Sequence, residues 1–237
     1  MVEFIPAKHL QSLEMMIWIL YNYSKVKQGN KHPLILVKDT MAIITISRQL
    51  GSLGTTLGRQ VATQLEYRLV HRELINQAAH LAGAPDMALA TIDELGLLGI
   101  KPEENQQRAY LEAVQTVIEN LASEGNVIIV GRAGQAILQN NPNTLHLRVI
   151  APLEVRIQRI VEAHGISHQA ARAQIEGSDR YRSGYLKRFY GIKWDDPSLY
   201  HLVINTGHIS LETSAEVVCT AIRNAPNHIP SQEATLG

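Results

Sequence analysis

From Met41 onward, short runs of β-branched and aliphatic residues alternate with longer stretches of helical periodicity. This alternation is typical of a parallel sheet whose strands are joined by crossover helices. Two of the runs, residues 42–46 and 127–130, are almost continuously apolar, as expected of strands covered on both faces. The pattern therefore predicts an α/β fold. The expected strands are residues 42–46, 68–70, 127–130, 145–150 and 202–205.

The stretches between these strands are predicted to be helical, except for one segment. Residues 177–197 have weak apolar periodicity but many Arg, Tyr and Asp residues, so we expect a mobile excursion over a site. The expected helices are residues 55–65, 73–81, 87–98, 104–124, 153–163 and 211–223.

Composition separates the first forty residues from the rest. Residues 1–40 contain five Lys and no Arg, whereas residues 41–237 contain fourteen Arg and three Lys. We expect residues 1–40 to be an N-terminal extension, residues 41–225 one α/β domain and residues 226–237 a flexible tail. Two interpretations of the extension stay open: a helical appendage over residues 10–23, or sequence upstream of a natural start at Met41.

The overall charge excludes some partner classes. Lys+Arg and Asp+Glu both total 22, so no global field attracts nucleic acid or an anionic membrane. The single Cys219 cannot form an intramolecular disulfide and cannot make a zinc site alone. The longest early apolar run, residues 15–20, is too short to span a bilayer. We expect a cytoplasmic protein without nucleic-acid or membrane partners; its oligomeric state is left open.

The first strand leads through a Gly- and Ser-containing turn into a helix, over residues 43–58. Such a turn can wrap phosphates, because glycine permits unusual φ angles and a helix N-terminus carries partial positive charge. The phosphate-loop motif G-x-x-x-x-G-K-[ST] is nevertheless not matched. In its register Arg48 replaces the first glycine, Leu53 the second, and Gly54 the lysine. A plain strand-to-helix turn is the alternative, and Arg48 could supply the missing cation.

Further arginines follow the later strands. Arg132 comes directly after the expected strand 127–130, where the carboxyl ends of parallel strands face a ligand crevice. A guanidinium there can grip a phosphate with two hydrogen bonds; capping a helix is the alternative. Arg156 and Arg159 share one side of the following helix, and a phosphate role and a solvated charged face stay equally open.

Four cations fall within ten residues further on: Arg180, Arg182, Lys187 and Arg188 stand near Asp179 in a stretch rich in basic residues. On a lid closing over polyphosphate these charges would neutralise the transferring group and exclude water. An RNA-facing patch or a solvated loop is the alternative.

Several motifs occur together in the order seen in a known family. They are SRQLGSLG (47–54), HRELI (71–75), IVGRA (129–133), APLEVRIQRI (151–160) and YGIKWDDPSLYHLVINT (190–206). The chain therefore resembles the cytidylate kinase-like family over residues 42–222. That resemblance implies a three-layer P-loop kinase fold with a five-stranded parallel sheet, a helical region that binds the nucleoside monophosphate, and an Arg-rich lid.

The resemblance also implies ATP with Mg²⁺ as phosphoryl donor and a pyrimidine nucleoside monophosphate, such as CMP, as acceptor. The partners are then small-molecule nucleotides. The implied donor loop comprises Gly51, Ser52, Leu53, Gly54, Thr55 and Thr56, with Thr55 or Thr56 at the metal. The expected acceptor side comprises Arg132, His71, Arg72, Arg156 and Asp179. The expected catalytic cations are Arg48, Arg180, Arg182 and Arg188.

Three departures from the family pattern bear on function: the first two concern turnover, and the third concerns cytosine specificity. Gly54 stands where cytidylate kinases carry the loop lysine, Leu53 replaces a glycine, and Ala133 replaces an aspartate that helps to hold the nucleotide. Without the lysine, another cation must neutralise charge near the leaving phosphate. A nucleotide-binding regulatory protein of the same fold with little or no kinase activity therefore stays an alternative, as does a kinase for another small acceptor.

Overall fold

The computed structural model describes residues 42–71, 75, 76, 80 and 104–224. The chain divides into two compact units, one comprising Met1–Asp39 and Arg72–Ser123 and the other Thr40–His71 and Glu124–Gly237. The two are considered separately. The predicted helices at 10–23 and 87–98 and most of that at 73–81 lie outside the described residues. The predicted domain boundaries near residues 40 and 226 stay predictions.

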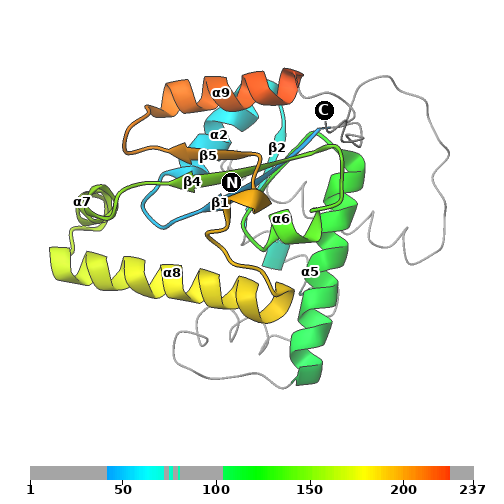
Figure 1. The fold of residues 1–237 in the computed structure, drawn as a ribbon, viewed down its shortest axis with the longest axis horizontal. Helices are drawn as coiled ribbons and strands as arrows, with labels where there is room; N and C mark the ends of the chain where they lie inside the picture. The colour runs from blue at the N-terminus through cyan, green and yellow to red at the C-terminus, as the bar shows by residue number, and fades with distance from the viewer. Residues whose placement is uncertain (1–41, 72–74, 77–79, 81–103, 225–237) are drawn as a thin grey trace, which may run out of the picture. The chain divides into compact units, whose positions relative to one another are not determined.

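The second unit is built on a five-stranded parallel sheet with the order β2-β3-β1-β4-β5 (Figure 1). This confirms the predicted α/β class and the parallel sheet, and each strand lies within two residues of its predicted bounds. The strands are β1 (Ile43–Arg48), β2 (Arg68–His71), β3 (Val127–Val130), β4 (Thr144–Ile150) and β5 (Leu202–Asn205).

Helices cover both faces of the sheet (Figure 1). On one face α2 (Gly54–Leu65) and α9 (Leu211–Asn224) pack on alternate residues of the central strands, such as Ile44, Ile46 and Leu147, which are all nearly inaccessible to water. Burial of this apolar surface is the main stabilising contribution to the fold. The other face carries the short α6 (Gly134–Ile137), and α7 (Leu153–His164) packs against α8 (His168–Tyr190).

The prediction of an irregular excursion over residues 177–197 is wrong as far as residue 190. Those residues are the second half of α8, a 23-residue helix. Its start is capped by Ser167, whose hydroxyl accepts from Ala170 N–H, and it ends at Gly191 in the left-handed conformation. The helix holds because Ala171 and Ile175 bury themselves against α7, which local sequence periodicity could not show.

The segment after α8 is anchored to the sheet by a buried polar and aromatic cluster. Trp194 Nε1 donates to Ser47 Oγ (2.8 Å), and the Arg148 guanidinium lies 4.5 Å from the Trp194 ring centroid. Arg148 also donates to Trp194 O, and Tyr200 hydroxyl accepts a further bond from it at 3.3 Å. These contacts fix the path from α8 through the 3-10 turn Pro197–Leu199 into β5.

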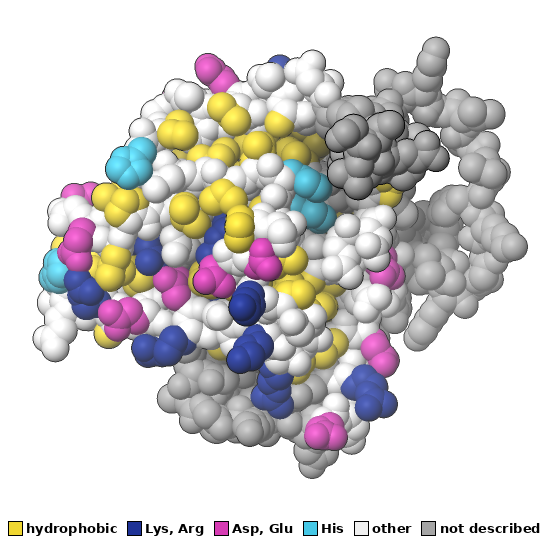
Figure 2. Space-filling view, in the orientation of Figure 1, with side chains coloured by type: hydrophobic (Ala, Val, Ile, Leu, Met, Phe, Trp, Pro, Cys, Tyr) yellow, Lys and Arg dark blue, Asp and Glu magenta, His cyan; other side chains and the backbone are white. Residues whose placement is uncertain are grey.

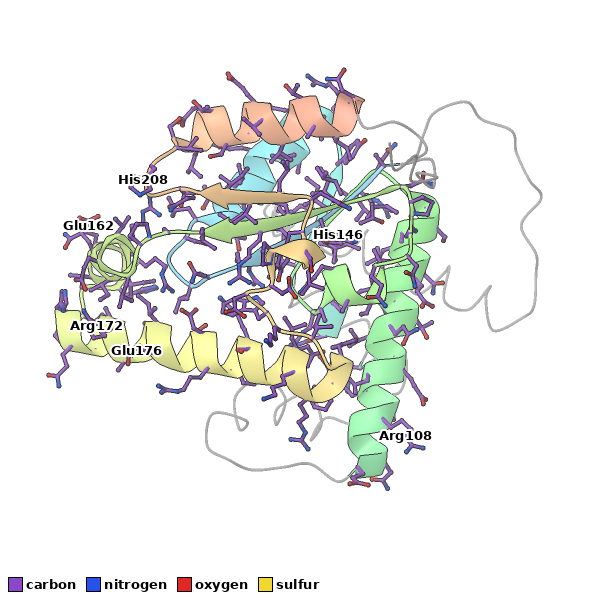
Figure 3. The ribbon with its side chains drawn as sticks, in the orientation of Figure 1. Arg108, His146, Glu162, Arg172, Glu176 and His208 are labelled. Carbon is purple, nitrogen blue, oxygen red and sulfur yellow. The ribbon has the colours of Figure 1, made fainter. Side chains whose placement is uncertain are left out.

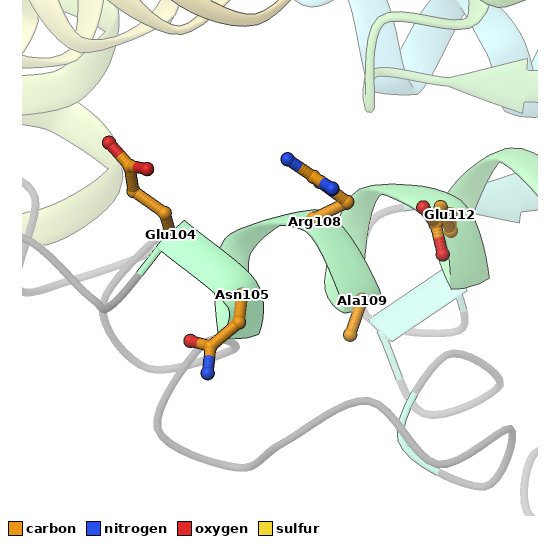
Figure 4. A pocket seen from close by; sticks show the side chains of 5 residues that line it. All are labelled: Glu104, Asn105, Arg108, Ala109 and Glu112. Carbon is orange, nitrogen blue, oxygen red and sulfur yellow. The ribbon is translucent and has the colours of Figure 1, made fainter.

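In the other unit, α5 (Glu104–Glu124) matches its predicted bounds. It buries Tyr110, Val114, Ile118 and Leu121, which recur at helical spacing along one side. An open recess of about 500 Å³ is lined by exposed residues of its first turns: Glu104, Asn105, Arg108, Ala109 and Glu112 (Figure 4). Within the described part of the chain, no helix combines the length and apolar character needed to cross a bilayer.

Candidate functional site

The carboxyl ends of β1, β2 and β3 lie side by side. Because the strands are parallel, Arg48, His71 and Val130 end at the same edge of the sheet, and His71 is the register partner of Val130. The turn after β3 is joined to β1 by a hydrogen bond from Gly131 N–H to Ile46 O (3.0 Å). Arg48, a predicted site residue, is thereby brought close to Gly131, which is 83 positions away and directly precedes the predicted Arg132. Arg72 lies outside the described residues.

The loop between β1 and α2 has the sharply turned backbone of a phosphate-binding loop. Gly51 has φ 79° and Leu53 has φ 61°, both in the left-handed region. Glycine adopts this region freely, whereas a leucine there is strained by about 1–2 kcal/mol. Leu53 therefore adopts a conformation that a glycine at this position would reach without strain. Helix α2 begins directly after it without a side-chain cap, so its first N–H groups are available to an anion.

The absence of a side chain at Gly54 leaves room for Arg48. A Cβ on Gly54 would lie 2.5 Å from Arg48 Cβ and 3.1 Å from Arg48 Cγ. From there the Arg48 side chain runs on to Gly131, where its guanidinium occupies the space that a Cβ on Gly131 would take. The Arg48 side chain thus extends from the start of α2 to the Gly131–Arg132 turn. On the way it passes Gly54, the position at which the motif carries lysine.

The turn after β3 holds Arg132 in an unusual backbone conformation. Gly131, Arg132 and Ala133 have consecutive φ values of 87°, 52° and 56°. Two non-glycine residues in this region store strain, which is common at functional sites. Arg132 is only 7% exposed, and its charge acts on Tyr190 at the end of α8, where burial raises the pKa of the tyrosine and Arg132 partly offsets that rise.

The predicted lid cations lie on α8 in different environments. Arg182 Nη1 donates to Arg48 O at 2.7 Å, so α8 contacts the end of β1. Arg180 and Arg188 are exposed, and the Arg188 guanidinium lies 5.2 Å from the Phe189 ring centroid. On the face shown in Figure 2, basic side chains gather over α8 with acidic ones among them.

Arg156 and Asp179, both predicted on the acceptor side, pair with each other. Arg156 Nη1 lies 2.8 Å from Asp179 Oδ2, and the same nitrogen is 3.5 Å from Leu50 O. The Arg156 side chain is 7% exposed and the Asp179 side chain 24% exposed. The pair therefore ties α7 to α8 behind the loop, a position better suited to holding the loop than to touching a substrate.

The hydroxyl groups around the loop are of two kinds: one forms a hydrogen bond within the loop, and the others form none among the described residues. Ser52 is buried and its hydroxyl donates to Gln49 O (2.8 Å), so it braces the turn. Thr55 is half-buried and Thr56 exposed, and neither hydroxyl has a hydrogen bond within the described part of the chain. In that part, no group of three or more His, Cys, Asp or Glu is arranged to hold a metal ion.

Thr206 was not predicted as a site residue. It follows β5 directly, and its hydroxyl donates to Ser52 O (2.8 Å) and accepts from Arg159 Nη1 (3.1 Å). Arg159 Nη1 also lies 3.2 Å from Gly51 O, and Arg159 Nη2 donates to Thr206 O at 2.8 Å. A polar residue immediately after a strand at this edge of the sheet was the signal that could have revealed it.

A five-stranded parallel sheet, helices on both faces and a turned loop before the uncapped α2 define a P-loop kinase fold. The model of the cytidylate kinase-like family matches residues 43–208, and the chain belongs to that family.

Curated relatives agree over most of their length. The chain is 32% identical over 186 residues to a cytidylate kinase of Pyrococcus horikoshii, covering 78% of this chain and 90% of the relative. It is 32% identical over 181 residues to a cytidylate kinase of Pyrococcus abyssi, covering 76% and 93%. An uncharacterized protein from Eubacterium ventriosum has a similar structure, with a TM-score of 0.63, 21% identity and coverage of 77% and 99%, which supports the fold alone.

Proposed function

We propose that this protein transfers a phosphoryl group from ATP to a nucleoside monophosphate, with CMP as the first acceptor to test. The path of Arg48 is the observation that carries the proposal. Its side chain crosses from Gly54 to Gly131, between the loop suited to the donor phosphates and the arginine expected to hold the acceptor. The names of the curated relatives supply the acceptor class.

The reaction requires positioning and charge neutralisation rather than a general base. An oxygen of the acceptor phosphate forms a bond to the γ-phosphorus, the bond from that phosphorus to the bridging oxygen breaks, and ADP leaves with the electron pair. Backbone N–H groups of the loop and of the first turn of α2 bind the donor phosphates. Arg48 neutralises charge between donor and acceptor, and Arg132 holds the acceptor phosphate.

The remaining groups fit ATP with Mg²⁺. Gly51 has no room for a Cβ, which would lie 2.9 Å from Arg156 O, so the loop keeps a backbone that can approach phosphates closely. Thr55 and Thr56 lie in the first turn of α2, and we propose the Thr55 hydroxyl, or that of Thr56, as a metal ligand. When bound, Mg²⁺ would supply charge neutralisation on the phosphate oxygens. Arg180, Arg182 and Arg188 are proposed to cover the transferred group from α8, with His71 and Arg72 on the acceptor side.

The test is a coupled ADP-release assay with a panel of nucleoside monophosphates, beside calorimetric titration with ATP and Mg²⁺. We expect turnover with at least one pyrimidine monophosphate. Arg48→Ala should lower kcat by about 10²-fold, as expected for removal of one well-placed charge donor. Arg132→Ala should chiefly raise the KM for the acceptor, and Arg182→Ala should chiefly lower kcat. Arg172→Ala, an exposed arginine elsewhere on α8, is the matched control and should change neither.

One observation favours a second candidate, a nucleotide-binding regulatory protein without transfer. Leu53 brings a branched side chain into the phosphate-binding turn. If that side chain blocks productive binding, ATP will bind without turnover for any acceptor, and Leu53→Gly will restore turnover. Turnover by the unaltered protein would exclude this candidate. Failure to bind ATP at millimolar concentration would contradict both.

A further inference from the structure

Side-chain donors hold the loop before α2 through hydrogen bonds to its backbone carbonyl groups. Each carbonyl oxygen from residue 48 to residue 52 accepts a side-chain hydrogen bond. The donors are Arg182 to Arg48 O (2.7 Å), Ser52 to Gln49 O (2.8 Å), Arg156 to Leu50 O (3.5 Å), Arg159 to Gly51 O (3.2 Å) and Thr206 to Ser52 O (2.8 Å). Apart from Ser52, these donors come from α7, α8 and the end of β5.

Holding a carbonyl outward determines where the next N–H points. In a planar trans peptide the C=O of one residue and the N–H of the next point in opposite directions. The bond from Thr206 to Ser52 O therefore directs Leu53 N–H away from Thr206. The N–H groups of Gly51 and Leu53 donate to no protein acceptor among the described residues. They are available to an anion.

Leu53 is the residue that most needs this support. Its left-handed φ of 61° is strained for a branched side chain, and such a conformation persists only where the surroundings enforce it. The surroundings here are Thr206, which is 6% exposed, and Arg159, which joins Gly51 O, Thr206 Oγ1 and Thr206 O into one network. Partial burial lowers the pKa of Arg159.

We propose that Thr206 and Arg159 are positioning residues for donor binding: they hold the strained Leu53 turn so that its N–H groups face the phosphates. A glycine at position 53 would adopt this turn without strain and would not need their support. This inference rests on the proposed function, because it assigns the loop to the phosphates of ATP. It assigns neither residue to the reacting atoms.

The experiment is a mutant cycle between position 206 and position 53, measured on the full chain. Thr206→Val removes the hydroxyl at nearly constant volume, and Thr206→Ser keeps it. Thr206→Val should raise the Kd and KM for ATP about tenfold, the effect of losing one hydrogen bond, and should leave the KM for the acceptor little changed. The thermal midpoint of Thr206→Ser should also be little changed. Thr206→Ser should stay within about threefold of the unaltered protein for ATP. Thr220→Val, an exposed threonine of α9, is the matched control.

The coupling between positions 206 and 53 in ATP binding shows whether Thr206 acts by supporting Leu53. In a Leu53→Gly background, Thr206→Val should weaken ATP binding by less than about threefold, because glycine adopts the turn without support. An equal tenfold loss in both backgrounds would overturn the proposal, and so would a lowered thermal midpoint with unchanged ATP affinity. If the unaltered protein binds no ATP, the proposed function itself fails. Normal ATP binding that is indifferent to Thr206→Val would sink only this inference.

Discussion

At the scale of single residues, two exchanges in the loop depend on each other. Arg48 occupies the space above residue 54, and residue 54 has no side chain. A side chain at residue 54 would lie too close to that of Arg48 unless the backbone shifted, because Arg48 Cβ is fixed by the strand backbone. The absence of a side chain at residue 54 and the presence of one at residue 48 are therefore sterically linked, and the cation here comes from the strand rather than from the helix.

The first prediction tests this dependence. Gly54→Ala should reduce the free energy of unfolding by about 1–3 kcal/mol, because the added Cβ overpacks against Arg48. Arg48→Gly in the same chain should recover most of that loss. Gly184→Ala is the control, since nothing lies within 4 Å of a Cβ there, and it should be neutral or stabilising. Urea denaturation measures the three variants beside the unaltered protein; no recovery in the double variant would contradict the dependence.

A second residue-scale prediction concerns His146 on β4 (Figure 3). Burial, with a smaller effect of neighbouring His201, lowers the pKa of His146 to about 4, and a backbone hydrogen bond to Leu138 opposes this. His146 Nδ1 lies 2.7 Å from Thr45 Oγ1, and the two histidine rings stack with centroids 5.0 Å apart. The folded state thus resists protonation that the unfolded state accepts near its ordinary pKa of about 6.5.

Stability should therefore fall as pH decreases from about 6.5 to about 4, by up to about 3 kcal/mol, and be insensitive to His146 above that window. The free energy of unfolding measured between pH 8 and pH 4.5 checks the direction. His146→Gln, which cannot titrate, should flatten the profile. An unchanged slope in that variant would contradict the assignment.

At the scale of elements, α7 and α8 act as a brace behind the loop. Their apolar contact involves Ile157, Ile160, Ala171 and Ile175, and the Arg156–Asp179 pair adds a largely buried charge interaction. Breaking such a pair costs more than its net contribution, because one charge is left buried without its partner. Arg156, which is 7% exposed, would be that charge.

We expect Asp179→Ala to lower the free energy of unfolding by about 2–3 kcal/mol. Arg156→Met together with Asp179→Ala should recover part of the loss, because the buried charge is then removed. The matched control is Arg172→Ala, which breaks an exposed pair with Glu154 and should cost less than about 1 kcal/mol. Chemical denaturation measures these free energies. Equal losses for the buried and the exposed pair would show that burial of the Arg156–Asp179 pair does not increase the cost of breaking it.

The elements also show where sequence periodicity is sufficient and where it is not. The strands and α2, α5, α7 and α9 were predicted with ends within two residues, since their apolar repeats are strong. The second half of helix α8 was missed. After Ile175 its buried side chains are Tyr185 and Leu186, which lie ten residues further along, beyond several charged residues. The short α6 follows three left-handed residues, and local propensity does not favour that conformation for Arg132 or Ala133.

At the scale of the whole molecule, the proposed donor should stabilise the fold by mass action. At a hundredfold excess over its Kd, ATP with Mg²⁺ should add about 2.7 kcal/mol, which raises Tm by about 5–10 °C for a chain of this size. Chelation of Mg²⁺ should remove most of this rise, because the described residues offer hydroxyls but no carboxylate cluster to hold the metal. Thr220→Val should behave as the unaltered protein. A shift that persists without Mg²⁺ would contradict the assignment of Thr55 and Thr56.

The sequence by itself determined the α/β class, the parallel sheet and the family, and it singled out the arginines as candidate phosphate ligands, because hydrophobic periodicity and short motifs are local properties. Only the tertiary structure decided what those arginines do. Arg156 and Asp179 pair with each other, Arg159 joins Thr206, Arg182 reaches the end of β1, and Arg48 takes the space left by Gly54. Each outcome depends on contacts between segments distant in the chain, and the same guanidinium can hold a loop or a ligand according to which carbonyl or phosphate the fold places beside it.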